Sequence, residues 1–113
     1  MRFEYNANLV GDDYVTLVAN EILDRFPLIS SIDAQKIASL TQTVDDRVSN
    51  DDKFYRCYLI MKYIGPEHEE FDHVFNDAYR YYDSGLTNEK YINTMEAIID
   101  FVSNGNGSFP DIY

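Results

Sequence analysis

Two histidines near the middle of the chain are the residues whose type and spacing first suggest chemistry. The segment His68-Glu-Glu-Phe-Asp-His73 is similar to the His-Glu-x-x-His zinc motif, but it is one residue longer. On a helix, residues five apart point about 140° away from each other, whereas zinc-binding histidines four apart differ by about 40°. We therefore expect no metal site in this segment.

The other residues with chemical potential lack the partners that catalysis needs. Glu70 and His73 form one Glu-x-x-His pair, whereas di-iron bundles use two such pairs and two further glutamates. Cys57 lies in the apolar run Phe-Tyr-Arg-Cys-Tyr-Leu-Ile-Met, which predicts a buried thiol and not a nucleophile. The Gly105-Asn-Gly107 segment follows a helical pattern, so we interpret it as an ordinary turn. The chain is predicted to be no enzyme and to bind no cofactor.

Charge is the strongest compositional signal. Among 113 residues there are 20 acids and nine bases, which give a formal net charge of −11. Nucleic acids and anionic membranes repel such a chain, because their binding relies on Lys and Arg. A basic protein surface attracts it and can be captured quickly. The alternative is that the acids only confer solubility.

The sequence also indicates in which cellular compartment the protein is expected. No apolar run reaches the roughly 18–20 residues that a membrane-spanning helix needs. The N-terminal Met-Arg-Phe-Glu-Tyr lacks the hydrophobic stretch of a secretory signal. A single cysteine excludes a disulfide within the chain. We expect a cytoplasmic protein.

Periodicity predicts an all-α fold in a single domain of residues 1–113. Apolar residues recur at steps of three and four in most of the chain, as they do on one face of a helix. The expected bundle has five helices, at about 12–25, 31–48, 51–64, 66–84 and 88–103. Residues 2–9 alternate like an extended segment that could pair with the tail. The C-terminal tail is rich in turn residues and is expected to be flexible, although its Phe109, Ile112 and Tyr113 could dock.

Local signals delimit these helices. Pro27 disfavours a helical Phe26, so the first helix is expected to end near Arg25. The expected N-caps are Ser30, Ser49 or Asn50, and Thr87, and the last helix is expected to end at Asn104 or Gly105. The second helix has a predicted core stripe of Ile37, Leu40, Val44 and Val48. The third helix is apolar nearly all round, which is typical of the middle of a bundle.

The helix expected at 66–84 organises the functional hypothesis. Pro66 suits its first position, and Glu67, Glu69 and Glu70 would follow in the first turn. Phe71, Val74, Phe75, Ala78 and Tyr82 share a predicted inner face. From Glu67 to Asp83 there are six acids and one arginine. Acids edged by Tyr79 and Tyr81 are typical of a surface that binds a basic protein, since Tyr is enriched at interface hot spots.

The sequence thus predicts a protein-binding function. The candidate partner-binding residues are Glu69, Asp72, Asp77, Tyr79, Tyr81 and Asp83, with Asp45, Asp46, Asp51 and Asp52 before and at the third helix. The favoured hypothesis is an inhibitor or immunity protein that masks a basic surface, such as that of a nuclease toxin. Alternatives are a phage-type DNA mimic that blocks restriction or CRISPR enzymes, and a non-catalytic adaptor or homo-oligomer subunit.

One pair of residues has a counterpart in a known family. Tyr81-Tyr82 resembles the tyrosine pair of colicin-type nuclease immunity proteins, which are short, acidic and helical. Here the pair is followed by Asp-Ser-Gly and not by Pro. No residue roles are therefore carried over from that family.

Overall fold

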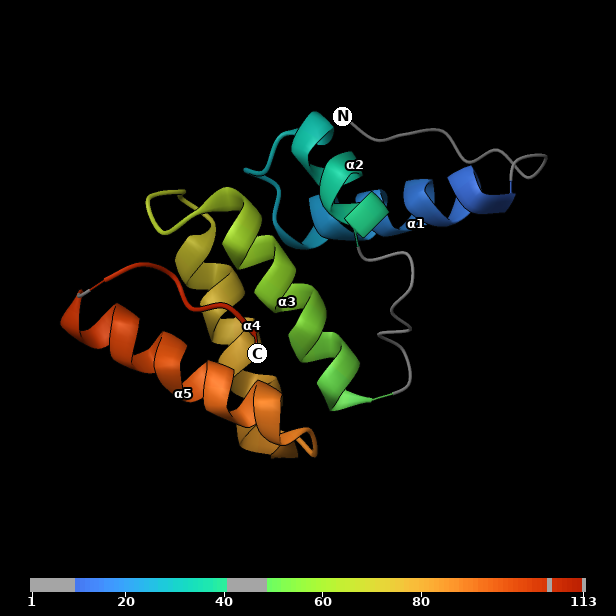
Figure 1. Cartoon of the computed structure of the whole chain (residues 1–113). Coiled ribbons are helices and arrows are strands. Elements are labelled where there is room, and N and C mark those ends of the chain that lie inside the picture. The colour runs from blue at the N-terminus through green and yellow to red at the C-terminus, as the bar shows by residue number, and fades with distance from the viewer. Residues whose placement is uncertain (1–9, 41–48, 106, 113) are drawn as a thin grey trace.

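The protein is all-helical over the residues that the computed structural model describes, which are 10–40, 49–105 and 107–112, with side chains described from residue 15. The five helices are α1 (Val10–Arg25), α2 (Ser31–Leu40), α3 (Asn50–Ile64), α4 (Phe71–Gly85) and α5 (Glu89–Asn104) (Figure 1). This confirms the predicted fold class and the number of helices. The N-terminal segment 2–9 and residues 41–48 of the predicted second helix lie outside the described residues.

Most helix ends coincide with the local signals. α1 ends at Arg25, two residues before Pro27. Ser30 Oγ accepts a hydrogen bond from the Asp33 N–H at 3.1 Å, and Ser49 Oγ caps α3 in the same way. Gly105 closes α5 in the left-handed region, with φ 66°, where a side chain would be strained.

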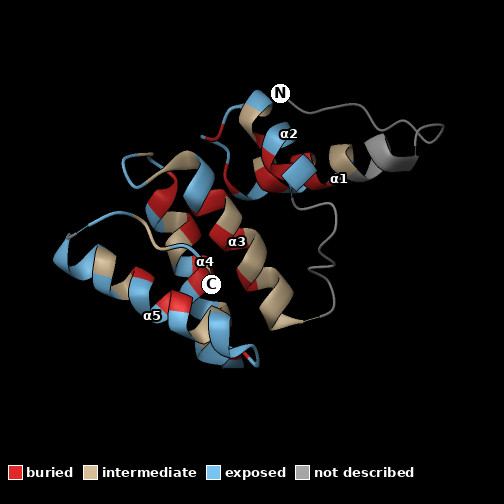
Figure 2. Cartoon of the chain, viewed as in Figure 1, coloured by how far each residue is buried: buried red, intermediate tan, exposed pale blue. Residues whose placement is uncertain are grey.

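α3 is the central helix of the bundle, as its apolar sequence predicts. It packs against α2, α4 and α5, whereas α1 packs mainly on α2 (Figure 1). Its buried side chains are Phe54, Cys57, Tyr58, Ile60 and Met61. Buried residues gather where α3 faces α4 and where α1 faces α2 (Figure 2). This burial is the main favourable term for folding, at roughly 25 cal/mol per Å² of apolar surface.

Leu40 corrects the predicted stripe of α2. Ile37 is fully buried, as expected, but the Leu40 side chain is 56% exposed. It lies at the last position of α2, on an open hollow that it shares with Leu59 and Tyr63 of α3. Helical spacing places Leu40 on the same side of α2 as Ile37. No described residue packs over Leu40 closely enough to bury it.

The start of α4 is the largest correction to the predicted boundaries. The helix begins at Phe71, not at Pro66, and Glu70 occupies the N-cap position. Residues 65–70 form turns, with the His68 N–H bonded to the Gly65 carbonyl at 3.2 Å and the Phe71 N–H to the His68 carbonyl at 3.0 Å. Gly65 has φ 83°, a left-handed value that lets the chain leave α3 and turn back. The glutamates expected in the first helical turn therefore lie in or next to this loop.

The C-terminal tail docks onto the bundle over residues 107–112. Phe109 lies in an aromatic pocket formed by Tyr58, Phe71 and Phe101, with ring centroids 5.7 to 6.1 Å away. The Tyr58 hydroxyl donates to the Pro110 carbonyl at 3.0 Å and accepts from the Ile112 N–H at 3.2 Å. Of the two possibilities for the tail, these described residues adopt the docked one.

The described helices also bear on membrane association. None of them combines the length and the apolar character that crossing a bilayer requires.

Candidate functional site

The outward side of α4 presents a narrow stripe of polar and aromatic residues. Asp72, Asn76, Tyr79 and Asp83 are all exposed. At about 100° per residue they fall within roughly 60° of each other, so they share one line along the helix. Three of the predicted partner-binding residues, Asp72, Tyr79 and Asp83, are therefore brought together on the surface.

Tyr79 is held in place by two further rings. Its side chain is 45% exposed, while its ring centroid lies 6.4 Å from that of Phe75 and 5.9 Å from that of Tyr82. The Tyr82 hydroxyl in turn donates to Glu96 of α5 at 3.4 Å. Partial desolvation, reinforced by the charge of Glu96, raises the pKa of Tyr82. Tyr82 thus stays protonated and links the two helices beneath Tyr79.

α5 adds acids that the sequence argument missed. Glu89, Glu96 and Asp100 are exposed and recur at steps of seven and four, so they lie on one flank of α5. The contact between Tyr82 and Glu96 shows that this flank borders the α4 stripe. The spacing of the three acids was visible in the sequence, but nothing there placed α5 beside α4.

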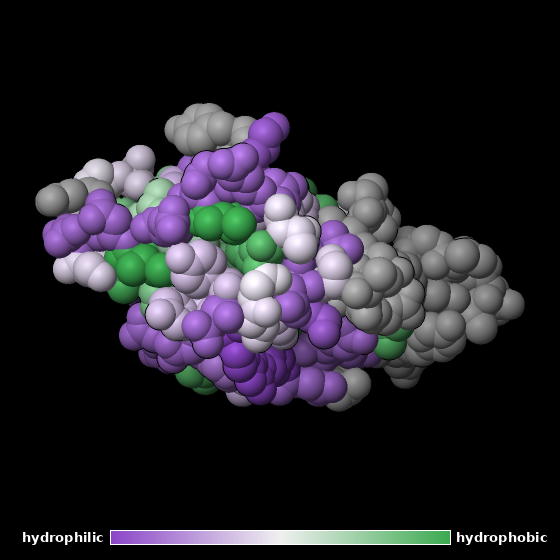
Figure 3. Space-filling view, turned by 90° about the horizontal axis from the view of Figure 1, so that it is seen from below, coloured by the Kyte–Doolittle hydropathy of each residue, from purple (hydrophilic) through white to green (hydrophobic). Residues whose placement is uncertain are grey.

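We call this surface the acidic face and define it by Asp72, Tyr79, Asp83, Glu89, Glu96 and Asp100. Hydrophilic residues predominate in the described part of the surface seen from below, with hydrophobic areas between them (Figure 3). Tyr79 is the exposed large aromatic residue in the acidic face. A rigid aromatic ring among carboxylates suits contact with a cationic side chain, through charge and through the ring face.

Asp77 corrects the predicted partner-binding set. It was expected on the outer surface, but it is only 5% exposed. Its carboxylate binds the Arg25 guanidinium through two hydrogen bonds of 2.8 and 2.6 Å, and Arg80 at 2.8 Å. Burial works to raise the pKa of Asp77, but the hydrogen bonds and charge of Arg25 outweigh it, with help from Arg80 and His73, and lower that pKa. Asp77 is occupied within the fold.

Glu70 is the second acid that turns inward. It is 5% exposed, and one carboxylate oxygen accepts the Leu28 N–H at 2.9 Å while the other lies 3.2 Å from His73 Nδ1. The His73 ring packs edge-on against Phe26, with centroids 4.8 Å apart. The Glu70–His73 pair therefore packs against Phe26 and Leu28, at the end of α1 and in the loop that follows it. We call the contacts of Glu70 and Asp77 with residues 25–28 the α1–α4 clamp.

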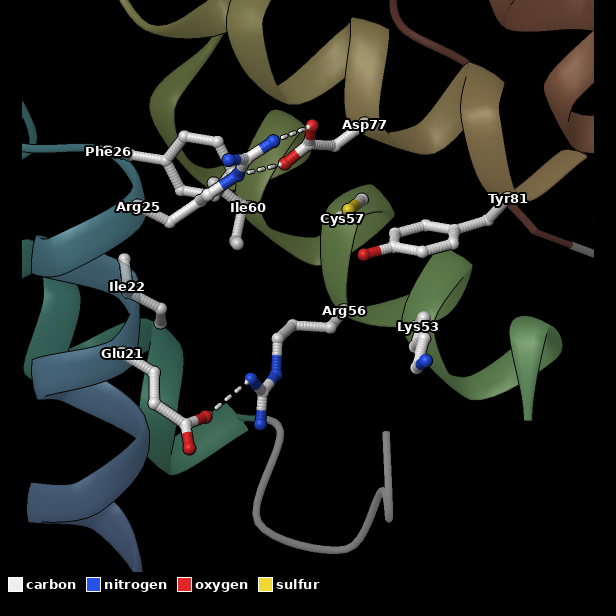
Figure 4. Close-up of a pocket in the computed structure, with 10 residues that line it drawn as sticks. All are labelled: Glu21, Ile22, Arg25, Phe26, Lys53, Arg56, Cys57, Ile60, Asp77 and Tyr81. Atoms are coloured by element: carbon white, nitrogen blue, oxygen red, sulfur yellow. Dashed lines mark hydrogen bonds and ion pairs between the residues drawn. The ribbon is translucent and has the colours of Figure 1, made fainter. Parts of the chain in front are cut away.

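Tyr81 lies at a cavity and not at the edge of the acidic face. The cavity has a volume of about 180 Å³ and lies between α1, α3 and α4 (Figure 4). Tyr81 is half-buried, and its hydroxyl points into the cavity towards Cys57 (Figure 4). Burial, followed by the effects of Cys57 and Asp77, raises the pKa of Tyr81. Cys57 itself is 6% exposed, which confirms the predicted buried thiol.

The same cavity is lined by both charges. Arg25, Lys53 and Arg56 contribute positive groups, and Glu21 and Asp77 contribute negative ones. Arg25 is bound to Asp77, and Arg56 is bound to Glu21 at 3.0 Å (Figure 4). These ion pairs join α1 to α3 and α4. The paired charged residues that line the cavity therefore have a structural role, which is to hold these three helices together.

The remaining predicted residues are dispersed. Asp51 lies at the start of α3 and accepts hydrogen bonds from the backbone and hydroxyl of Thr87. Burial works to raise the pKa of Asp51, but the bonds from Thr87 and from the Asn88 backbone lower it. Thr87, the expected N-cap of α5, thus binds Asp51 instead. Asn88 caps α5, and its side chain accepts a hydrogen bond from the Lys90 N–H at 2.9 Å.

Two of the four other candidate residues lie among the described residues. Asp52 is half-buried beside Asp51, and Glu69 is exposed in the loop before α4. Asp45 and Asp46 lie outside the described residues. The ten predicted residues therefore do not form one site.

No group of three or more His, Cys, Asp or Glu side chains in the described ranges is arranged to hold a metal ion. Comparisons with protein-family models, with curated proteins and with solved structures found no match. The function of this chain is therefore inferred from its own surfaces.

Proposed function

We propose that this chain is a small acidic protein-binding domain, an inhibitor or immunity protein that masks a basic surface such as that of a nuclease toxin. The observation that supports it is the acidic face, where five carboxylates are exposed along α4 and α5 and the exposed ring of Tyr79 lies in line with two of them on α4. A nuclease groove is positive because it binds phosphate, and it therefore attracts such a surface.

The arrangement of the acids favours recognition over mere solubility. Scattered charges would be enough for solubility, whereas here the acids border a supported tyrosine. Tyr is a frequent hot-spot residue because it adds contact area and one hydrogen-bonding group at a small entropic cost. The carboxylates around it would steer a basic partner and set its orientation.

Affinity capture from the native host tests the proposal. The tagged wild-type chain is expected to retain one basic, nuclease-like protein, and capture is expected to weaken as salt is raised, because exposed charges are screened. Capture of a restriction, CRISPR or other DNA-binding complex would favour the DNA-mimic alternative. A chain that captures nothing and forms a stable homo-oligomer would contradict the proposal.

Two variants locate the interface once the partner is known. Tyr79→Ala is expected to weaken binding by about 2 kcal/mol, or roughly 30-fold, if Tyr79 is a hot spot. Asp83→Lys is expected to slow association at low salt. Asp24→Lys is the matched control, because Asp24 is also an exposed aspartate near the end of a helix, α1, but lies outside the acidic face. Equal losses for Asp83→Lys and Asp24→Lys would place the interface elsewhere.

A further inference from the structure

The groove between α3 and α5 differs in character from the acidic face. Its walls are aromatic: Tyr55 stacks between Tyr58 and Tyr91, with centroids 6.3 and 5.6 Å away. Lys62 of α3 and Lys90 of α5 line it. A chain of net charge −11 therefore has a groove that is lined by aromatic rings and by two bases.

The chain's own tail occupies this groove and shows what the groove recognises. Phe109 fills the pocket between Tyr58, Phe71 and Phe101. The next residue with a charge, Asp111, binds Lys62 at 2.5 Å. The groove thus binds an aromatic side chain and, two residues later, a carboxylate.

The side chain of Tyr58 binds the backbone of the tail. The Tyr58 hydroxyl donates to the Pro110 carbonyl and accepts from the Ile112 N–H. A hydroxyl is both donor and acceptor, so one tyrosine satisfies two backbone groups of an extended segment. These bonds do not depend on the identity of the tail's side chains, so another segment of the same shape could make them.

The tail leaves part of the groove empty. A cavity of about 280 Å³ lies beside Pro110 and Asp111, lined by Lys90, Asn93 and Thr94 of α5. A second, open hollow of about 590 Å³ lies at Ile112, beside Tyr55, Leu59 and Tyr91. A segment with larger side chains would gain contacts there that the tail does not make.

We propose that the α3–α5 groove is a second interaction site, which binds an extended acidic segment of a partner protein with an aromatic residue, a proline, an acid and a large apolar residue in that order. The tail occupies the site in cis, and a partner segment displaces it. Exchange of tails between two copies of the chain is disfavoured, because each groove would make the same contacts with the partner's tail that it already makes with its own. The site is separate from the acidic face, so either proposal can fail without the other.

The tail competes with any partner segment for the groove. A short connection to α5 holds it near the groove at an effective concentration on the order of 1 mM. A separate copy of the tail sequence is therefore expected to bind the wild-type chain poorly. Weakening the tail should expose the groove to the same peptide.

The test uses full-length variants and a fluorescent peptide, Gly-Ser-Phe-Pro-Asp-Ile, which copies residues 107–112. Phe109→Ala is expected to bind it at least about tenfold more tightly than the wild type does, by fluorescence polarisation, since the competing tail has lost its anchor. Ser108→Ala is the matched control, because Ser108 is an exposed tail residue and should leave binding at the wild-type level. A peptide with Phe and Asp exchanged should not bind.

A second variant keeps the test decisive if Phe109→Ala fails to fold by circular dichroism. Asp111→Lys changes a side chain that is 59% exposed and sets it against Lys62, so the tail is loosened while Phe109 remains. It too is expected to bind the peptide more tightly than the wild type does. If neither variant binds the tail peptide more tightly than it binds the peptide with Phe and Asp exchanged, the proposal is wrong.

A third measurement checks the partner chemistry. Replacing the last peptide residue, Ile, by Trp should tighten binding to Phe109→Ala at least about threefold, because the larger ring reaches the hollow beside Tyr55 and Tyr91. No gain would contradict the role of that hollow. A wild-type dimer that becomes monomeric in Phe109→Ala, by light scattering, would instead identify a second copy as the occupant and overturn the proposal.

Discussion

The two sides of α4 carry the same kind of residue in opposite environments. Asp72 and Asp83 are exposed on the acidic face, whereas Asp77 lies between them in sequence and is almost completely buried. Asp77 binds two arginines, and no cation lies in a comparable contact with Asp72 or Asp83 among the described interactions. The number of acids in a helix is thus a poor measure of the charge that it offers to a partner.

The difference matters for the proposed function. Six acids occur between Glu67 and Asp83, and two of them, Glu70 and Asp77, belong to the α1–α4 clamp. These two hold α1 and the following loop against α4. The exposed ones remain available for a partner, and α5 supplements them with Glu89, Glu96 and Asp100. One side of α4 therefore maintains the fold, and the other is exposed to solvent.

Removing the charge of Asp77 should have the largest effect on stability. Asp77→Asn is expected to lower the free energy of unfolding by about 2 kcal/mol, because it weakens charged hydrogen bonds at a buried position. The loss is moderated because the Arg25 side chain is 50% exposed and can be hydrated. Asp72→Asn should change the same quantity by less than about 0.5 kcal/mol in urea denaturation. Equal effects would refute the contrast between the two sides.

The pH dependence of stability should reveal the same contrast. The pKa of Asp77 is lowered in the folded state, so its contribution is present above the ordinary Asp value, about 3.9, and is lost as the pH falls through the lower folded value. The urea midpoint of the wild type should therefore fall more than that of Asp77→Asn between pH 6 and pH 3. Parallel decreases in the two proteins would mean that Asp77 does not contribute.

Glu70 should give a smaller effect than Asp77. Glu70→Gln keeps an oxygen that can accept the Leu28 N–H but removes the charge next to His73, so we expect a loss of about 1 kcal/mol. Glu69→Gln is the control, because Glu69 is the exposed neighbour and should change stability by less than about 0.5 kcal/mol. Thermal unfolding at pH 7 measures both. A loss for Glu69→Gln as large as that for Glu70→Gln would exclude a specific role of Glu70.

The smallest effect on stability is expected on the acidic face. Asp83 lies in the last turn of α4, where a positive charge interacts favourably with the helix dipole. Asp83→Lys should therefore leave the free energy of unfolding unchanged or raise it by a few tenths of a kcal/mol, while it weakens binding to a basic partner. A clear loss of stability in urea denaturation would show that Asp83 has a structural role.

Much of the fold could be predicted because its signals are local. Pro27 ends α1, Ser30 and Ser49 cap the helices that follow, and Gly105 ends α5. The apolar pattern of α3 identified the central helix. Each of these features involves residues within a few positions of one another, so the sequence contains the whole signal.

The start of α4 could not be predicted for a physical reason. Pro66 and the glutamates after it fit the first turn of a helix, but Glu70 bonds to the Leu28 N–H, 42 residues away. The loop 65–70 also has to reverse the chain after α3. Local preference is worth a fraction of a kcal/mol per residue, and tertiary contacts of this kind override it.

The sequence alone determined that this is an acidic, all-helical protein and which residues share each helix face. Helical periodicity gives each residue an angle, but it does not say which neighbour lies at that angle. Only the tertiary structure placed Arg25 next to Asp77, Glu96 next to Tyr82 and Phe109 between three aromatic rings. The first two contacts join residues 52 and 14 positions apart, and the rings around Phe109 come from α3, α4 and α5. They decide which acids maintain the fold and which remain exposed.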